Sequence, residues 1–234
     1  MDIKRVFTNF CEQLRNRTEF TSEDTIRYYW FASMLKQDDN LNDFILEKPY
    51  EELQNKELDL WYGNQTSKEP WALEIKFHRN TKQADFAKTY GAGAIFDDLQ
   101  RLCRIKNCAG INCHRLLLYV TDEVMHNYLC AGGNSYREQL KEFYNMQENG
   151  KPISFTFADH KSNSDVPYTF LESANWSFAG TKTDRRIGFS VKNIKLVGKA
   201  DFEIPDTKYQ SFGEDKEGKH LCHVRLYEII QNLF

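Results

Sequence analysis

The amino-acid sequence predicts an α/β fold with a central mixed β-sheet flanked by helices. Apolar side chains recur at helical spacing in some segments and alternate with polar side chains in others, which are the patterns of amphipathic helices and half-buried strands. Taken in order between residues 22 and 157, these patterns give α-β-β-β-α-β-α-α-β. The segment from Arg115 to Val120 is almost entirely apolar, as expected of a strand buried in the middle of a sheet.

The first half of the chain begins with two predicted helices, over residues 3–14 and from about 22 to 36, because apolar side chains fall on one face of each. Three predicted strands follow, at residues 44–47, 57–62 and 71–77. The last two are joined by a polar stretch rich in turn residues, which predicts a hairpin loop at 63–70.

In the second half, the spacing predicts a helix over 91–106, the strand near 115–120, helices near 123–130 and 135–147, and a strand at 153–157. The rest of the chain is strand-like at 168–171, 187–196 and 221–230. We therefore predict an α/β core with an N-terminal helix over residues 1–158. A β-rich extension over residues 159–234 packs on this core or recognises a substrate.

Length and composition place the chain among folded proteins. It has 234 residues, of which 41% are hydrophobic and 28% charged. Such a chain can bury a sizeable core, and its composition excludes a mostly disordered protein. No apolar run approaches the ~20 residues of a membrane span, and the N-terminus lacks the apolar stretch of a signal peptide. We expect a cytoplasmic protein without a membrane partner.

The strand at 71–77 carries the residues that suggest chemistry. Because side chains alternate between the faces of a strand, its large apolar residues share one face, and Glu74 and Lys76 share the other. Charged groups are rarely fully buried unless they are paired or bind a metal ion. A short hairpin brings Asp59, on the preceding strand, opposite the Glu74 region. Two carboxylates that converge with one lysine form a site for a hard cation such as Mg²⁺.

Asp59, followed after a hairpin by Glu74-Ile75-Lys76, resembles the motif of the PD-(D/E)xK nuclease superfamily, which includes many restriction endonucleases. The order helix, three strands, helix and strand is similar to the core of that superfamily. The resemblance covers about residues 20–157 and implies a restriction endonuclease-like core. One departure is Leu58, which stands before Asp59 where the motif has proline.

The resemblance implies a Mg²⁺-dependent endonuclease, a hydrolase that cuts DNA phosphodiester bonds in restriction or other defence against invading DNA. It implies the catalytic residues Asp59, Glu74, Lys76 and Glu23. The metal ligands would be Asp59, Glu74, Ile75 and Glu23, with Mg²⁺ or Mn²⁺ as the ion, and Lys76 would support the attacking water. Restriction enzymes of this kind commonly act as dimers, so a homodimer is a further expectation.

Several alternatives stay open for the acidic residues. Asp24 or Glu57 could take the place of Glu23 as the third acid, because each lies close to a proposed ligand in the sequence. An acid in the first turn of a helix is also favourable for the helix dipole alone. Glu74 and Lys76 could instead form an exposed cross-strand salt bridge on an edge strand.

Other potential ligands give weaker patterns. His78 shares the face of Lys76, either in contact with substrate or as an ordinary residue at the end of a strand. Cys103, Cys108 and Cys113 are spaced by five residues, which is wider than the spacing of most structural zinc sites. We interpret these cysteines as ordinary thiols, with metal binding as the alternative.

The net charge of −3 hides basic segments that could bind a polyanion. Residues 76–115 contain 8 Lys/Arg against 3 Asp/Glu, and residues 180–199 contain 6 against 1. The candidate substrate-binding residues in and near these segments are Arg79, Lys82, Arg101, Arg104, Arg185 and Arg186. Two alternatives to a DNA endonuclease are a nuclease that acts on RNA and a nucleic-acid-binding or regulatory protein on a nuclease-like scaffold without catalysis.

Overall fold

The computed structural model describes twelve segments of the chain, namely residues 1–17, 22–38, 40–50, 56–63, 69–78, 88–105, 113–131, 135–157, 170–171, 186–187, 189–204 and 220–230. The helices among them are α1 (Ile3–Arg15), α2 (Glu23–Leu35), the short 3-10 helix η1 (Leu41–Asp43), α3 (Lys88–Arg104), α4 (Glu123–Cys130) and α5 (Ser135–Tyr144). The strands are β1 (Phe44–Pro49), β2 (Glu57–Tyr62), β3 (Trp71–His78), β4 (His114–Asp122), β5 (Ile153–Phe157), β6 (Phe170–Leu171), β7 (Arg186–Ile187), β8 (Phe189–Ile204) and β9 (His220–Ile229).

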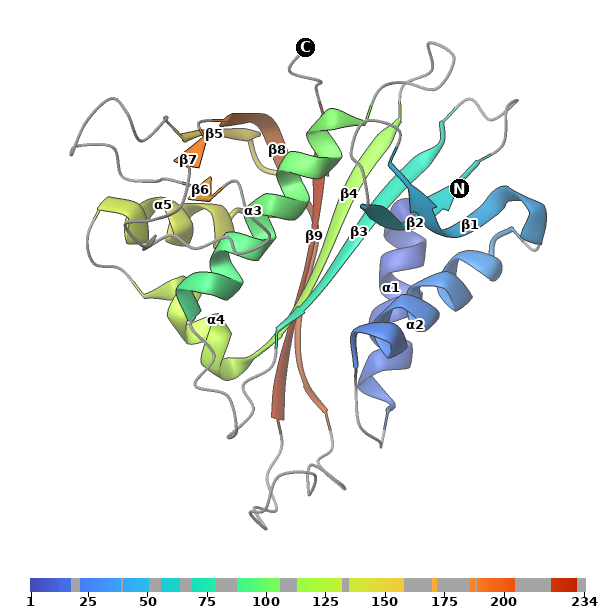
Figure 1. Ribbon diagram of the computed structural model, residues 1–234. Helices are drawn as coiled ribbons and strands as arrows, with labels where there is room; N and C mark the ends of the chain where they lie inside the picture. The colour runs from blue at the N-terminus through green and yellow to red at the C-terminus, as the bar shows by residue number, and fades with distance from the viewer. Residues whose placement is uncertain are drawn as a thin grey trace.

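A seven-stranded mixed sheet in the order β1-β2-β3-β4-β9-β8-β5 forms the centre of the fold (Figure 1). β3 and β4 pair in parallel, which requires the crossover that α3 provides. The other neighbouring strands pair antiparallel. The predicted α/β class, with a mixed sheet flanked by helices, is confirmed.

Helices cover both faces of this sheet (Figure 1). α1 and α2 lie on one face, where Val6, Phe10 and Trp30 are completely buried against Leu73 and Ile75 of β3. The carboxylate of Asp2 caps α1 by accepting a hydrogen bond from the backbone N–H of Lys4 at 2.9 Å.

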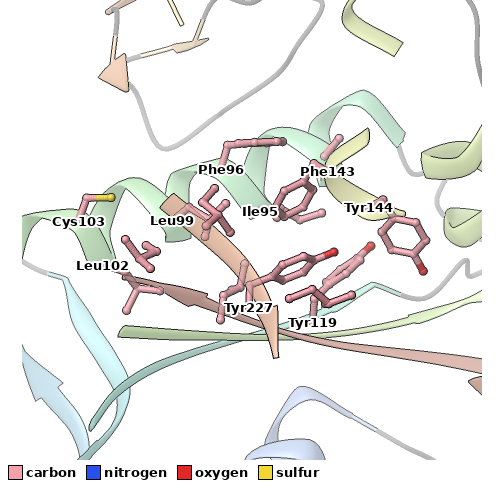
Figure 2. Packing of buried hydrophobic residues seen from close by; sticks show 14 of the residues in the cluster. Ile95, Phe96, Leu99, Leu102, Cys103, Tyr119, Phe143, Tyr144 and Tyr227 are labelled. Atoms are coloured by element: carbon pink, nitrogen blue, oxygen red, sulfur yellow. The ribbon is translucent and has the colours of Figure 1, made fainter. Parts of the chain in front are cut away.

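The opposite face is covered by α3, α4 and α5 (Figure 1). Figure 2 shows Ile95, Phe96 and Leu99 of α3 above Tyr119 of β4 and Tyr227 of β9. All five side chains are at most 2% exposed, so this layer excludes water from the middle of the sheet. The face that carries α3 is also the face of Glu74 and Lys76, which places these two residues at the margin of a dry core.

The predicted strands and helices agree with those observed, with small shifts of their ends. The largest difference is β8, which continues to Ile204 and shifts its register on β9 between Leu196 and Gly198. A β-carbon at Gly198 would lie 2.9 Å from the ring of Phe7, so α1 approaches the strand where a side chain is missing.

Strands on both sides of residue 158 belong to one sheet, because β9 pairs with β4 and β8 pairs with both β9 and β5. The division of the chain into a core and an extension, with a recognition role for the latter, stays a prediction. None of the helices in the described residues is both long and apolar enough to cross a bilayer.

Candidate active site

β3 displays the predicted alternation of faces. Leu73 and Ile75 pack toward α1 and α2, whereas Glu74 is 1% exposed and forms an ion pair with Arg101 of α3. Since β3 lies between β2 and β4, it is an interior strand. The interpretation of Glu74 and Lys76 as an exposed salt bridge on an edge strand is therefore wrong.

The edge of β3 that faces β2 is capped by carboxylates where strand pairing stops. The paired register of β2 and β3 ends at Leu60 and Leu73. Beyond that point, Asp59 Oδ2 accepts a hydrogen bond from the backbone N–H of Ile75 at 2.6 Å. Two residues further along, Glu23 Oε2 accepts from the N–H of Phe77 at 3.0 Å. The structure thus attaches Asp59 and Glu23 to the strand that carries Glu74 and Lys76.

Of the three acids proposed for the position of Glu23, only Glu23 itself is bonded to β3. It is the first residue of α2, which the Ser22 hydroxyl caps by accepting from the N–H of Thr25 at 3.2 Å. Burial raises the pKa of Glu23, against the opposing effect of Lys76. Asp24 is 73% exposed and Glu57 is exposed, and neither has a hydrogen bond to β3.

Glu74 is held by two side chains from outside its own strand. The hydroxyl of Tyr50, just after β1, donates a short hydrogen bond to Glu74 Oε1, and Arg101 Nε donates to the same oxygen at 3.2 Å. Burial, followed by repulsion from Asp98, raises the pKa of Glu74 well above its usual range. Extra negative charge here is therefore costly, and an added cation would offset it.

Lys76 forms an ion pair with Asp98 of α3, with 3.3 Å between Nζ and Oδ2. Burial works to lower the pKa of Lys76, but Asp98 and Glu23 outweigh it and raise the pKa above its ordinary value. Lys76 is consequently an ammonium group near neutral pH. It can orient a water molecule or offset negative charge, but it does not act as a base.

Arg101, a predicted substrate-binding residue, lies among three carboxylates. Its guanidinium bonds Asp97 at 3.0 Å, Glu74 at 3.2 Å and Asp98 through a short contact. Asp97 and Asp98 stand four and three residues before Arg101 on α3, so all three side chains project from neighbouring positions on the helix. The position of α3 over the sheet turns this group toward Glu74.

Arg27 plays the corresponding role for Asp59. Its Nη2 donates to Asp59 Oδ1 at 2.6 Å, and its Nη1 lies 3.1 Å from Glu47. Sequence reasoning missed Arg27, Tyr50 and Asp98. The spacing of Arg27, four residues after Glu23 on one helix, was the one local sign that it could lie near the site.

The other candidate residues lie elsewhere. His78 is 6% exposed and bonds the hydroxyl of Tyr119, and burial lowers its pKa to about 3, so it is a neutral residue of the interior. Cys103 and Cys113 are buried. Arg79, Lys82, Arg185 and Cys108 fall outside the described residues, as do the side chains of Arg104 in α3 and Arg186 in β7.

Asp59 and Glu74 have the chemistry that a hard cation requires. Mg²⁺ prefers one or two carboxylates and keeps several water ligands, and burial, together with repulsion from Asp98 and Asp59, raises the pKa of Glu74. Within the described part of the chain, no three Asp, Glu, His or Cys side chains are arranged to hold a metal ion together. With two carboxylates from Asp59 and Glu74, water would complete the coordination of such an ion.

We compared the chain with protein-family models, with curated proteins and with solved structures, and none of the three comparisons gave a match.

Proposed function

We propose that this protein is a Mg²⁺-dependent endonuclease that hydrolyses DNA phosphodiester bonds, of the restriction or anti-invader defence type. The observation that carries this proposal is the hydrogen bond from the N–H of Ile75 to Asp59. It brings the carboxylate of β2 to the strand of Glu74 and Lys76, which is the grouping that the PD-(D/E)xK resemblance implies.

The arrangement of the chain also supports the proposal. α2, β1, β2, β3, α3 and β4 follow one another in the order helix, three strands, helix, strand, and β1 to β4 are neighbours in the sheet. β1, β2 and β3 form an antiparallel meander, and β4 pairs in parallel with β3. A restriction endonuclease-like core is therefore part of the proposal.

Asp59 and Glu74, together with Ile75, hold the divalent ion in this proposal, and Glu23 assists from α2. The ion supplies Lewis-acid polarisation of the phosphate and a more acidic bound water. Lys76 keeps its proton and stabilises negative charge on the phosphate as the attacking water adds. Asp98 holds the ammonium group of Lys76 in place through their ion pair.

A second candidate function is nucleic-acid binding or regulation without catalysis. It is favoured by the guanidinium groups of Arg101 on Glu74 and of Arg27 on Asp59, because each already supplies a positive charge to a proposed metal ligand. A divalent ion at Glu74 therefore competes with Arg101 for the same oxygen.

Incubation with supercoiled plasmid DNA and with a folded RNA, each with Mg²⁺ or with EDTA, distinguishes these functions. The proposal predicts that plasmid is linearised or nicked with Mg²⁺ only. Sequencing of the ends then separates a sequence-specific enzyme, with discrete ends, from a nonspecific one. Cleavage of RNA alone reassigns the substrate. Salt-sensitive binding of DNA with no cleavage under Mg²⁺ or Mn²⁺ contradicts the enzyme and supports the second candidate.

A further inference from the structure

A second polar cluster lies on the same face of the sheet as Lys76, two strands away. Lys76 is opposite Tyr119 on β4, Tyr119 is opposite Arg225 on β9, and Arg225 is opposite Lys199 on β8. Since neighbouring strands are about 4.8 Å apart, Arg225 and Lys76 start about 10 Å apart on the sheet. Figure 2 shows that Tyr119 extends from the sheet in the direction of Tyr144, the last residue of α5.

Arg225 is a completely buried arginine that uses only part of its hydrogen-bonding capacity. Its side chain is 0% exposed. Its Nη1 donates to Asp201 Oδ1 at 2.6 Å and to the carbonyl oxygens of Val224 at 2.9 Å and Ala200 at 3.3 Å. Its Nε and Nη2 have no hydrogen-bond partner among the described residues. The guanidinium lies over the ring of Tyr144, 4.9 Å from the ring centroid.

Two stacked histidines adjoin this arginine. The rings of His126, on α4, and His223, on β9, are 3.6 Å apart between centroids and nearly parallel. His223 Nδ1 bonds Asp201 Oδ1 at 2.8 Å, the same oxygen that Arg225 contacts. His223 Nε2 is buried and has no partner within the described part of the chain. His126 Nδ1 bonds the hydroxyl of Tyr144 at 3.0 Å.

The unpartnered Nε and Nη2 of Arg225 indicate what kind of ligand could bind here. A buried donor without an acceptor costs about 1–3 kcal/mol, and more when it is charged. Nε and Nη2 of arginine form one edge of its planar fork, which binds two oxygens of a carboxylate or phosphate at once. An acceptor with two or more oxygens therefore matches Arg225 better than a single-atom ligand does.

The charges around the cluster favour an anion. Arg225 and Lys199 are cationic, and Asp201 is the acid that contacts the cluster. Burial, together with His223 and Arg225, lowers the pKa of His126 to about 4, so His126 adds no charge near neutral pH. The hydroxyls of Tyr119, Tyr144 and Tyr227 have raised pKa values because of burial and also stay neutral.

We propose that Arg225, His223 and His126 form an oxyanion-binding site for a phosphate group, separate from the candidate active site. His126 and Cys130, both on α4, are only half-buried, and Lys199 is exposed, so the margin of the cluster lies at the surface, whereas the unpartnered atoms of Arg225 and His223 are buried behind it. The guanidinium edge of Arg225 holds two phosphate oxygens, and Nε2 of His223 accepts a hydrogen bond from a protonated third oxygen, because Nδ1–H of the neutral ring donates to Asp201. The site does not depend on the proposed DNA hydrolysis.

Calorimetric titration of the full chain with inorganic phosphate near neutral pH tests this site. We expect one phosphate per chain, with at least tenfold weaker binding in Arg225→Lys, which keeps the charge but loses the planar fork. Lys36→Met, which removes an exposed charge at the end of α2, is the matched control and keeps wild-type phosphate affinity. Loss of binding in Lys76→Met, with Arg225→Lys unaffected, would place the phosphate in the candidate active site and overturn the proposal.

A second measurement does not rely on a variant that must fold. In the wild-type protein, the imidazole ¹⁵N signals of His126 and His223 shift as phosphate is added, while those of His114, paired with Glu228 at the other end of β4, do not. Absence of phosphate binding in the wild-type protein contradicts the site and leaves buried water as the partner of these atoms. Titration with a nucleoside 5′-monophosphate and with the unphosphorylated nucleoside shows whether the bound phosphate belongs to a larger molecule. Binding of the unphosphorylated nucleoside as tight as that of the monophosphate also contradicts the site.

Discussion

The carboxylate of Asp59 takes the place of a neighbouring strand on Ile75. Its Oδ2 accepts the backbone N–H of Ile75 at 2.6 Å, just past the last paired residues of β2 and β3. An unpaired N–H in a sheet interior is costly, so the separation of the two strands requires an acceptor there. The Asp59 side chain thereby satisfies the N–H of Ile75 and is held beside Glu74.

Asp59→Asn is expected to weaken divalent binding. The amide keeps an oxygen that can accept from Ile75 but removes the charge that holds a cation, so we expect at least tenfold lower affinity for Mn²⁺ by calorimetry. Asp24→Asn is the matched control, since Asp24 also pairs with Arg27, at 3.5 Å, but is 73% exposed. Equal losses in the two variants would mean that general charge, and not the position of Asp59, determines binding.

Lys76 and Asp98 are expected to be energetically coupled. Lys76→Met leaves a buried carboxylate without its ammonium partner, and we expect a loss of about 1–3 kcal/mol in the free energy of unfolding. Asp98→Asn in the Lys76→Met background should cost less than the sum of the two single changes. Urea unfolding of all four proteins measures this coupling, and strict additivity would contradict the ion pair.

Removal of Arg101 is expected to make stability depend on divalent ions. Arg101→Met leaves Glu74, Asp97 and Asp98 without their shared guanidinium. In EDTA we expect a fall in melting temperature of roughly 5–10 °C, from a loss of about 3 kcal/mol. Mg²⁺ should then raise the melting temperature of Arg101→Met more than that of the wild-type protein.

The control for Arg101 is Arg15→Met, because Arg15 is an exposed residue of α1 that lies over Phe202, a residue packed in the core between α1 and the sheet. It should change neither the melting temperature in EDTA nor the response to Mg²⁺ by more than a degree or two. If Mg²⁺ stabilises Arg101→Met and wild-type protein equally, Arg101 does not occupy a cation position.

The raised pKa of Glu74 predicts a loss of stability as pH rises. The unfolded chain releases this proton near pH 4.5, whereas the folded protein keeps it to higher pH because Glu74 is buried. In that window the folded state binds more protons than the unfolded state, so the free energy of unfolding decreases with pH. Above the folded pKa, the dependence due to Glu74 levels off.

Glu74→Gln removes this titration and should give a flatter pH profile than the wild-type protein above about pH 4.5 in urea unfolding. Glu228 raises the pKa of His114, so the stabilising effect of His114 is also lost with rising pH. Because both proteins contain His114, the difference between their pH profiles does not include its contribution. Identical slopes in the two proteins would show that Glu74 ionises in the folded state as it does in the unfolded chain.

Local patterns in the sequence predicted those parts of the site that lie within one strand. The period-two alternation of β3 is sufficient to place Glu74 and Lys76 on one face and Ile75 on the other. The hairpin between β2 and β3 likewise made the approach of Asp59 predictable. These features depend on neighbours in the chain, which a sequence displays directly.

The remainder depends on contacts between distant segments. Tyr50 reaches Glu74 across 24 residues, and Arg27 reaches Asp59 across 32. The residues next to Arg101 in the sequence mark it only as a basic residue on a helix. Its side chain reaches Glu74 because Leu99 and Leu102 of the same helix pack against the sheet. The insertion of β9 beside β4 also requires pairing between residues at least 100 positions apart. No local periodicity in the sequence specifies these contacts between distant segments.

The central claim is that Asp59, Glu74 and Lys76 form the active site of a nuclease. Comparing plasmid cleavage by the Lys76→Met and Lys36→Met variants tests it most directly. Lys36 is an exposed residue at the end of α2, so the two changes remove the same charge from a buried and from an exposed position. We predict that wild-type protein and Lys36→Met cut plasmid DNA with Mg²⁺ and not with EDTA, and that Lys76→Met is at least a hundredfold slower. Cleavage by Lys76→Met at the wild-type rate would contradict a site built on Asp59, Glu74 and Lys76, and so would the absence of cleavage by the wild-type protein with either Mg²⁺ or Mn²⁺.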